Sequence, residues 1–188
     1  RLLIPRLRRA GMTGRDENKE GGPEIAEMGG FAIVAGFSAG LLLAIFFGTF
    51  LAFQFNLVYV LAALITIHTI AFIGIADDLL SIPQWLKAVL PLFAAVPLVA
   101  VRAAGSTTIA LPLLGAIDFG IVYIIILVPL AIAVCSNLTN MLAGFNGLEG
   151  GMGAVMFGAL ALIALSNGSA EMSILSLSML GALLGFLV

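Results

Sequence analysis

Charged residues are scarce in this sequence. The 188 residues include only 8 Lys or Arg and 10 Asp or Glu, while 62% are hydrophobic. Soluble domains carry about a quarter charged residues, so a soluble fold of this length would lack the polar surface that covers a core. The formal net charge of −2 provides no basic surface for a nucleic acid. The composition excludes most soluble enzymes, nucleic-acid binders and disordered chains, and it indicates a protein that crosses a membrane several times.

Cysteine is almost absent as well. The single cysteine, Cys135, excludes an internal disulfide and a Cys-rich metal site. A signal peptide is not evident either, because the basic N-terminus is followed by Gly, Asp, Glu and Pro rather than by an apolar segment. The first residue is Arg rather than Met, and the last lies inside an apolar run. We therefore expect the chain to be part of a longer protein.

Long uncharged runs divide the sequence into candidate membrane helices. A helix that spans a bilayer needs about 20 mostly apolar residues. The runs are continuously apolar rather than alternating, which disfavours membrane β-strands. We predict an all-α, polytopic helix bundle that forms a single membrane domain. Its six spans lie near residues 30–53, 57–76, 85–103, 119–136, 151–166 and 172–188.

The basic residues predict the orientation of these spans, because Lys and Arg concentrate in cytoplasmic loops. If the N-terminal segment is cytoplasmic, every basic residue except Arg102 lies on that side. The cytoplasmic loops then lie near residues 1–29, 77–86 and 137–150. The opposite side carries little polar chemistry, and residues 103–118 there suit a small β-hairpin or a segment lying flat on the membrane. Polar chemistry on one side favours a site there over a pore or a plain bundle.

An acidic pair closes the predicted second span. Asp77 and Asp78 repel each other at a membrane face unless a cation, a lysine or water neutralises them. Carboxylate oxygens suit Mg²⁺, which keeps waters and bridges to substrate phosphates. Lys87 follows ten residues later, so it is expected at the same depth, where it pairs with an aspartate or holds a phosphate. The alternatives are a solvated acidic pair at a helix end and a lysine that reaches to the interface.

Residues 137–150 form the most specific polar stretch. Asn137 and Asn140 are three residues apart, so they share a face where the helix continues. Amides at the end of a membrane helix are costly without partners. Gly144 and the Asn146-Gly147 pair indicate a turn that brings the backbone close to something. We favour a binding site over the alternative, a capped turn between helices.

The first loop offers weaker candidates. Lys19 is a candidate contact for a phosphate, and Glu27 is a candidate acceptor for hydroxyl or amide donors. The alternative for this segment is a solvated, charged loop that only sets the topology.

Four segments together resemble one family, the polyprenyl-phosphate N-acetylhexosamine-1-phosphate transferases (glycosyltransferase family 4). Within it they are most similar to the branch that acts on UDP-GlcNAc and dolichyl phosphate, in an archaeal form. The matching segments occur in the family's order, at residues 14–19, 27–30, 74–80 with Lys87, and 137–149. The resemblance implies a fold of about ten membrane helices, of which this chain lacks the first and the last three.

The resemblance also implies roles for individual residues. Asp77, Asp78 and Lys87 match catalytic positions, namely the paired acids beside the metal and the lysine that contacts the lipid phosphate. Asn140 and Asp78 match the site of Mg²⁺, with Mn²⁺ as an alternative. The implied substrate-binding residues are Glu17, Lys19, Glu27, Lys87, Asn137, Gly144 and Asn146. Of these, Asn146 with the Gly144 backbone matches the uridine site, and Glu27 matches a contact to the nucleotide sugar.

The sequence departs from the family in two respects. Glu20 and Ala26 replace prolines that are common in the first loop. The second carboxylate ligand of Mg²⁺ and the loop that reads the sugar lie downstream in relatives. The 188 residues alone are therefore expected to be inactive.

The implied activity is the first membrane step of lipid-linked glycan synthesis. GlcNAc-1-phosphate passes from UDP-GlcNAc to a polyprenyl (dolichyl) phosphate and UMP is released, at a cytoplasmic-facing site of the cell membrane. The implied partners are these two substrates, membrane lipid and, for the assembly, a second copy in a homodimer. Rival interpretations are a relative using undecaprenyl phosphate or another UDP-N-acetylhexosamine, a non-catalytic scaffold, and an ion-coupled transporter. Transporters usually place such acids near the bilayer midplane rather than at a helix end, which disfavours the last.

Overall fold

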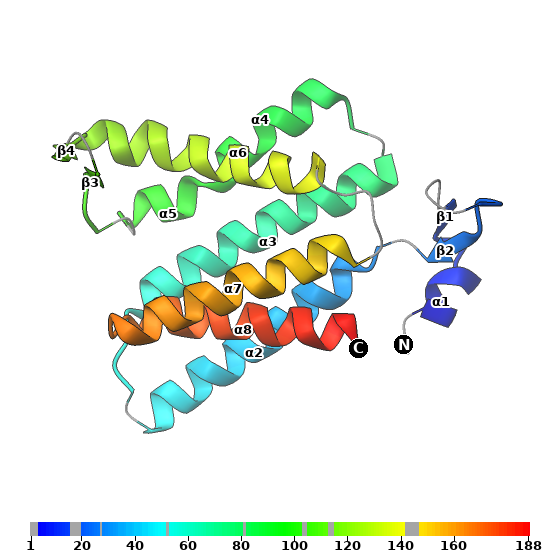
Figure 1. The fold of residues 1–188 in the computed structure, drawn as a ribbon, viewed down its shortest axis with the longest axis horizontal. Helices are drawn as coiled ribbons and strands as arrows, with labels where there is room; N and C mark the ends of the chain where they lie inside the picture. The colour runs from blue at the N-terminus through cyan, green and yellow to red at the C-terminus, as the bar shows by residue number, and fades with distance from the viewer. Residues whose placement is uncertain are drawn as a thin grey trace. The chain divides into compact units, whose positions relative to one another are not determined.

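The computed structural model describes residues 4–15, 20–26, 28–51, 53–80, 82–102, 105–112, 115–141 and 147–188. The chain divides into two compact units, and Figure 1 traces the path through both. Unit 1 comprises residues 1–55 and 142–188, and unit 2 comprises residues 56–141.

Unit 1 is built on three long helices. These are α2 (Gly30–Leu51), α7 (Leu148–Ser166) and α8 (Ala170–Leu187). α8 packs against both α2 and α7, so the unit joins the two ends of the sequence. Phe37 and Leu41 of α2 and Ala164 of α7 are fully buried in its core.

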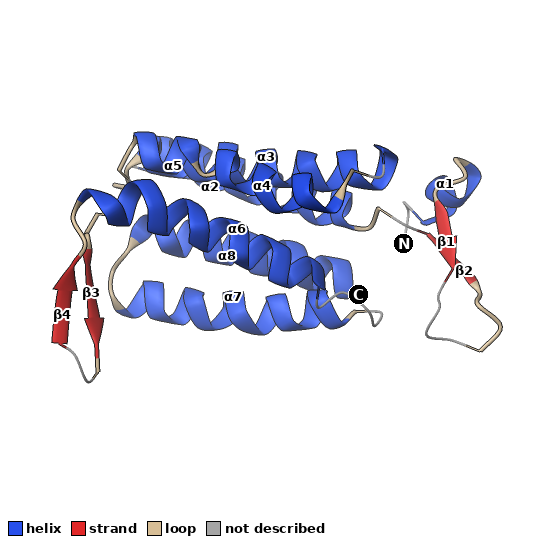
Figure 2. Cartoon of the chain, turned by 90° about the horizontal axis from the view of Figure 1, so that it is seen from above, coloured by secondary structure: helices blue, strands red, loops and turns tan. Residues whose placement is uncertain are grey.

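A small subdomain precedes α2. It consists of the helix α1 (Ile4–Arg9) and an antiparallel pair, β1 (Thr13–Arg15) and β2 (Glu24–Ala26), with α1 packed on β2 (Figure 2). Residues 1–29 are predicted above to be a loop, and the structure adds these three short elements to that segment. They are too short and too polar to show a hydrophobic period, which is why the sequence does not indicate them.

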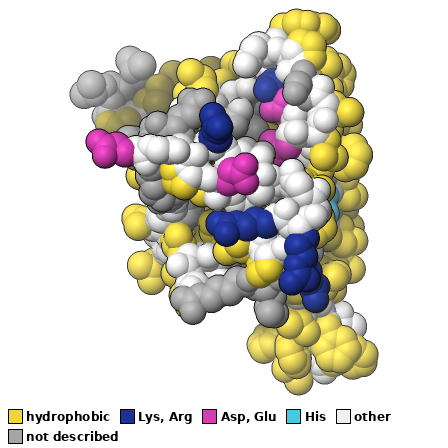
Figure 3. All heavy atoms as spheres, turned by 90° about the vertical axis from the view of Figure 1, so that its right-hand side faces the viewer, with side chains coloured by type: hydrophobic (Ala, Val, Ile, Leu, Met, Phe, Trp, Pro, Cys, Tyr) yellow, Lys and Arg dark blue, Asp and Glu magenta, His cyan; other side chains and the backbone are white. Residues whose placement is uncertain are grey.

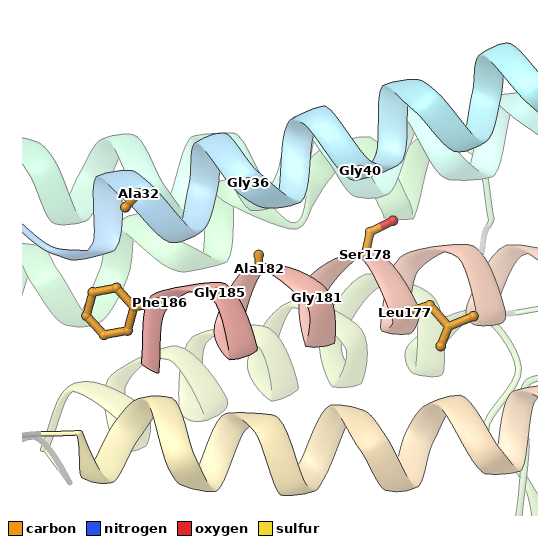
Figure 4. Close-up of a pocket in the computed structure, with 9 residues that line it drawn as sticks. All are labelled: Ala32, Gly36, Gly40, Leu177, Ser178, Gly181, Ala182, Gly185 and Phe186. Atoms are coloured by element: carbon orange, nitrogen blue, oxygen red, sulfur yellow. The ribbon is translucent and has the colours of Figure 1, made fainter. Parts of the chain in front are cut away.

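Small residues line the seam between α2 and α8. A Cβ at Gly36 would lie 3.3 Å from the Ala182 Cβ, and one at Gly40 would lie 3.4 Å from the Ser178 Cβ. Small residues at such spacing let membrane helices approach closely, where van der Waals contact replaces the hydrophobic effect as the driving force. A groove of about 490 Å³ runs along this seam (Figure 4). The glycines therefore set the distance between the two helices.

This seam carries the first prediction. We expect Gly36→Leu to lower the stability of the protein by about 1–3 kcal/mol, because the added side chain overpacks the contact with Ala182. Thermal unfolding in detergent measures the loss. Gly158→Leu in α7 is the matched control, because a Cβ there meets no atom of the described residues within 4 Å. Equal unfolding midpoints for the two variants would contradict the close packing of α2 on α8.

Unit 2 contains the remaining helices. α3 (Leu57–Leu80) is followed by α4 (Gln84–Ala94) and α5 (Val96–Ala100), then by the hairpin β3 (Thr108–Leu111) and β4 (Gly115–Asp118). A π-helical turn, η1 (Tyr123–Leu127), leads into α6 (Val128–Met141). α4 packs against both α3 and α6. Consequently α3 ends, α4 begins and α6 ends at one end of the unit, which we call the polar end (Figure 1).

Prolines explain the irregular helices of unit 2. Pro97, in the first turn of α5, lacks the N–H that would continue the α4 ladder to the Phe93 carbonyl, and the Ala95 N–H binds that carbonyl instead. Pro129 follows η1 and likewise has no N–H to donate. Just before it, the Val128 N–H binds the Tyr123 carbonyl five residues back, which is the π-helical pattern. The helix Gln84–Ala100 is therefore broken at Ala95.

Five described helices are long and apolar enough to cross a membrane, namely 30–51, 57–80, 123–141, 148–166 and 170–187. They confirm five of the six predicted spans. The predicted span at 85–103 is instead the shorter, broken helix pair α4–α5. Outward-facing side chains such as Phe50 and Phe72 are 71% exposed, which suits contact with lipid rather than water. The chain is an integral membrane protein.

The hairpin expected within residues 103–118 is present (Figure 2). Its open end is closed by Asp118, whose Oδ1 accepts hydrogen bonds from the Thr107 hydroxyl at 2.5 Å and the Gly120 N–H at 2.9 Å. These bonds favour the carboxylate, with Thr107 contributing most, and they hold the pKa of Asp118 below its ordinary value.

We expect hydrogen–deuterium exchange in residues 105–120 to be faster in Asp118→Asn than in the native protein at neutral pH. A lowered folded-state pKa means that the carboxylate stabilises the hairpin above the ordinary pKa of Asp, and that this contribution disappears as the pH falls through the lowered value. The two proteins should therefore converge at acidic pH, after correction for intrinsic exchange rates. Equal protection at neutral pH would show that Asp118 does not hold the hairpin closed.

Candidate active site

The candidate site lies at the polar end of unit 2. Asp77 and Asp78 occupy the last turn of α3, and Lys87 occupies the first turn of α4. α4 starts directly after Pro83, whose fixed φ and extended ψ suit the entry to a helix. The Pro83 carbonyl accepts the Leu86 N–H at 2.9 Å and the Lys87 N–H at 3.2 Å. The short connection therefore returns the chain so that Lys87 faces the end of α3.

Asp77 is the centre of this turn. Its Oδ1 lies 2.7 Å from the Lys87 Nζ and accepts the Ile82 N–H at 3.1 Å. The two side chains are only 20% and 23% exposed, so water screens their charges less than at an open surface. The Asp77 carboxylate thus closes the connection between α3 and α4, and it also fixes the position of the Lys87 ammonium group.

The end of α6 contributes amides. The Asn137 Nδ2 donates to the Ala133 carbonyl at 2.8 Å, and the Thr139 hydroxyl donates to the Cys135 carbonyl at the same distance. Both side chains are thereby bound to their own helix. Asn140 lies one turn after Asn137 and is exposed. Because α6 packs on α4, its last turn lies at the same end as Lys87.

Charges of both signs occur in each unit. Figure 3 draws them, with Lys and Arg side chains in dark blue and Asp and Glu side chains in magenta beside yellow hydrophobic ones. Within unit 2, the charges at the polar end are those of Asp77, Asp78 and Lys87.

The donor set is compatible with a hard divalent cation. Asp78 and Asn140 supply carboxylate and amide oxygens at the polar end, and Mg²⁺ typically binds one or two such protein ligands while keeping waters. Within the described ranges, no group of three or more His, Cys, Asp and Glu side chains is placed to hold a metal by itself. The residues fit a cation that is completed by substrate phosphates rather than one held in a closed protein cage.

Of the predicted site residues, the structure places Asp77, Asp78, Lys87, Asn137 and Asn140 at the polar end of unit 2, and it joins Asp77 to Lys87 directly. The others, Glu17, Lys19, Glu27, Gly144 and Asn146, lie outside the described residues. The turn expected at Asn146-Gly147 is present at Gly147, whose φ of +81° precedes α7.

Pairing with an aspartate is one of the roles considered above for Lys87, and in the structure its partner is Asp77. Two features of the arrangement are not visible in the sequence. One is the Ile82 N–H that binds the same carboxylate oxygen. The other is the choice between two adjacent acids, which depends on the rotation of α3 against α4. The proline before α4 is the signal that marks the connection as tight.

These features define a polytopic membrane protein with a polar candidate site at the ends of lipid-facing helices. The family model described as "Glycosyl transferase family 4" matches residues 60–188. The chain belongs to this family. The match includes Asp77, Asp78, Lys87, Asn137 and Asn140, so it covers the described part of the candidate site.

Individual relatives agree with the family. The chain is 38% identical to proteins of Sulfolobus acidocaldarius and Saccharolobus solfataricus, each named provisionally as a UDP-N-acetylglucosamine–dolichyl-phosphate N-acetylglucosaminephosphotransferase. The alignments cover 99% of this chain, and 57% and 56% of the two relatives. The protein with that activity name from Dictyostelium discoideum is 37% identical over 78% of this chain and 40% of its own length. The chain thus spans little more than half of the archaeal relatives.

Proposed function

We propose that the full-length protein transfers GlcNAc-1-phosphate from UDP-GlcNAc to a polyprenyl phosphate and releases UMP. The observation that carries the proposal is the Lys87–Asp77 pair, held beside Asp78 and the end of α6 on helices with apolar outer faces. The relatives named for this activity support the choice of substrates. The reaction joins a lipid to a nucleotide sugar, so it requires a polar site that is open to both membrane and water.

In the proposed reaction, an oxygen of the lipid phosphate attacks the β-phosphorus of UDP-GlcNAc. A new P–O–P bond forms, the bond from the β-phosphorus to the bridging oxygen breaks, and that oxygen leaves with UMP. A phosphate monoester has a second pKa of about 6, so the lipid phosphate is already mostly dianionic at neutral pH. A general base would add little, and we propose direct attack.

Lys87 binds the lipid phosphate in this proposal. Its ammonium group offsets the repulsion between the lipid phosphate and the diphosphate, and Asp77 keeps it in position. Asp78 and Asn140 would hold Mg²⁺, which when bound neutralises charge that develops on the departing phosphate. The positive-inside rule supports a cytoplasmic position for the site, where the nucleotide sugar is available.

The test is UMP release by membranes that contain the full-length protein. We expect release from UDP-GlcNAc only when polyprenyl phosphate and Mg²⁺ are both present. Undecaprenyl phosphate, dolichyl phosphate and a panel of UDP-N-acetylhexosamines identify the preferred pair. UDP-MurNAc-pentapeptide belongs in the panel, because a Halalkalibacterium halodurans protein named phospho-N-acetylmuramoyl-pentapeptide-transferase is 39% identical over 44% of this chain and 26% of its own length. A folded protein that releases no UMP from any pair would overturn the proposal.

A further inference from the structure

Positive charge is concentrated at the start of the chain. Residues 1–15 carry five arginines and no acidic residue, whereas residues 16–27 carry five acidic residues and one lysine. The N-terminal segment is therefore divided into a basic part that contains α1 and an acidic part that follows it. The proposed mechanism uses none of these arginines.

The described arginines have different surroundings. The Arg8 Nη2 donates to the Glu24 carbonyl at 3.4 Å, so this side chain lies against β2. Arg15 stands opposite the acidic Glu24 in the register of the hairpin, on β1 rather than on α1. Arg6 and Arg9 are exposed, and their spacing of three residues places them on one face of α1. Among the described residues, neither of these two forms an ion pair.

The chain keeps α1 near the start of a membrane helix. α1 packs on β2, β2 ends at Ala26, and the membrane helix α2 begins at Gly30. Four residues of chain span at most about 14 Å, so the subdomain stays close to the bilayer. Ile4 is 46% exposed and adds an apolar side chain to α1.

We propose that Arg6 and Arg9 form a docking surface for the headgroups of anionic phospholipids, which holds α1 and the β1–β2 hairpin against the bilayer. Guanidinium groups are weakly hydrated and match the oxygens of a phosphate, so they suit this contact. A basic residue next to an anionic membrane surface contributes about 1 kcal/mol. The two arginines are presented on one exposed helix rather than inside a pocket, which favours an extended charged surface over a soluble nucleotide as the partner.

The test measures how closely α1 approaches the lipid. In the full-length protein every cysteine, including Cys135, is replaced by alanine, and a fluorescent label is attached to Ala10→Cys, an exposed position directly after α1. It is reconstituted in phosphatidylcholine vesicles with or without about 30 mol% phosphatidylglycerol, each containing a headgroup spin label that quenches the dye. We expect stronger quenching with the anionic lipid, and a loss of this difference when salt rises from about 0.05 to 0.5 M.

The variants separate the surface from a general effect of charge. We expect Arg6→Gln/Arg9→Gln to weaken docking about 30-fold, which corresponds to two residues at about 1 kcal/mol each. Arg6→Lys/Arg9→Lys should retain most of the docking, and Arg15→Gln, which removes the same charge from a position on β1 opposite the acidic Glu24, should change it little. Quenching that is equal in both lipids, or unchanged in the double glutamine variant, would overturn the proposal. Displacement of the label by UDP at constant ionic strength would assign the arginines to a nucleotide and overturn it as well.

Discussion

We expect Lys87→Ala in the full-length protein to lower the rate of UMP release by about 100- to 1,000-fold, by analogy with the loss of one preorganised donor from an oxyanion site. The Lys87 Nζ is held 2.7 Å from the Asp77 Oδ1 in a partly buried pair, so its position is set before substrate arrives. Steady-state kinetics with both substrates varied measures the loss. Lys87→Arg keeps the charge but presents a planar fork instead of a compact ammonium group, so it should restore only part of the rate.

The Lys87–Asp77 ion pair also predicts how substitutions of the two residues combine. Asp77→Asn retains an oxygen that accepts the Ile82 N–H but loses the charge that holds Lys87. If Asp77 acts by positioning Lys87, the double variant with Lys87→Ala should be about as slow as Lys87→Ala alone, because both changes remove the same contribution. Asp78→Asn is the matched control, since its effect should multiply with that of Lys87→Ala.

Multiplying effects for Asp77→Asn and Lys87→Ala would contradict the positioning role. Asp77 would then act on the substrate or the metal directly. The unfolding midpoint shows whether a loss of activity is only a loss of folding. It should fall little in Asp77→Asn, because the hydrogen bond from the Ile82 N–H remains.

The membrane helices could be predicted because lipid imposes length and apolarity on each of them. Their ends could not be predicted as well. Hydropathy indicated an end at residue 76 for the second span and at 136 for the fourth, but α3 continues to Leu80 and α6 to Met141. An apolar run reports how far a helix lies in hydrocarbon, whereas the backbone hydrogen bonds continue into the polar interface. The candidate residues Asp77, Asp78 and Asn140 occupy these last turns, so they lie on helices rather than on loops.

The irregular parts depend on contacts that spacing does not reveal. Pro91 and Pro97 are both visible in the sequence, but α4 continues through Pro91 and breaks only at Ala95. The packing of α8 on α2 joins segments far apart in the chain, and the glycines that allow it are spread among many others. For the site, the ten-residue spacing and short connection placed Lys87 at the depth of the aspartates, with an ion pair as one of its possible roles. The sequence does not show which aspartate pairs with Lys87, or that the Ile82 N–H binds the same oxygen. Both depend on the relative orientation of α3 and α4.

The second large effect is expected for a substitution of Asn140, at the end of α6. We expect Asn140→Ala in the full-length protein to raise the Mg²⁺ concentration for half-maximal activity by at least about 10-fold, a loss that even groups that merely orient a metal ligand cause. Asn140 is exposed at the polar end, whereas the Asn137 amide nitrogen one turn earlier is already bound to the Ala133 carbonyl. That bond fixes the Asn137 side chain through its nitrogen and does not use its oxygen, so the choice of Asn140 rests on its greater exposure and on its place in the last turn of α6.

Binding must be measured apart from turnover, because a weaker metal site and a damaged substrate site both slow the reaction. Mn²⁺ serves as the probe, since its electron paramagnetic resonance spectrum separates bound from free ion, and Asn140→Ala and Asp78→Asn should both weaken its binding. Thr139→Val is the matched control in the same turn, because the Thr139 hydroxyl is bound to the Cys135 carbonyl and takes no part in the proposed site. If Asn140→Ala leaves Mn²⁺ affinity and Mg²⁺ activation at the level of Thr139→Val, Asn140 is not a ligand. The cation would then depend on Asp78 and on groups outside the described residues.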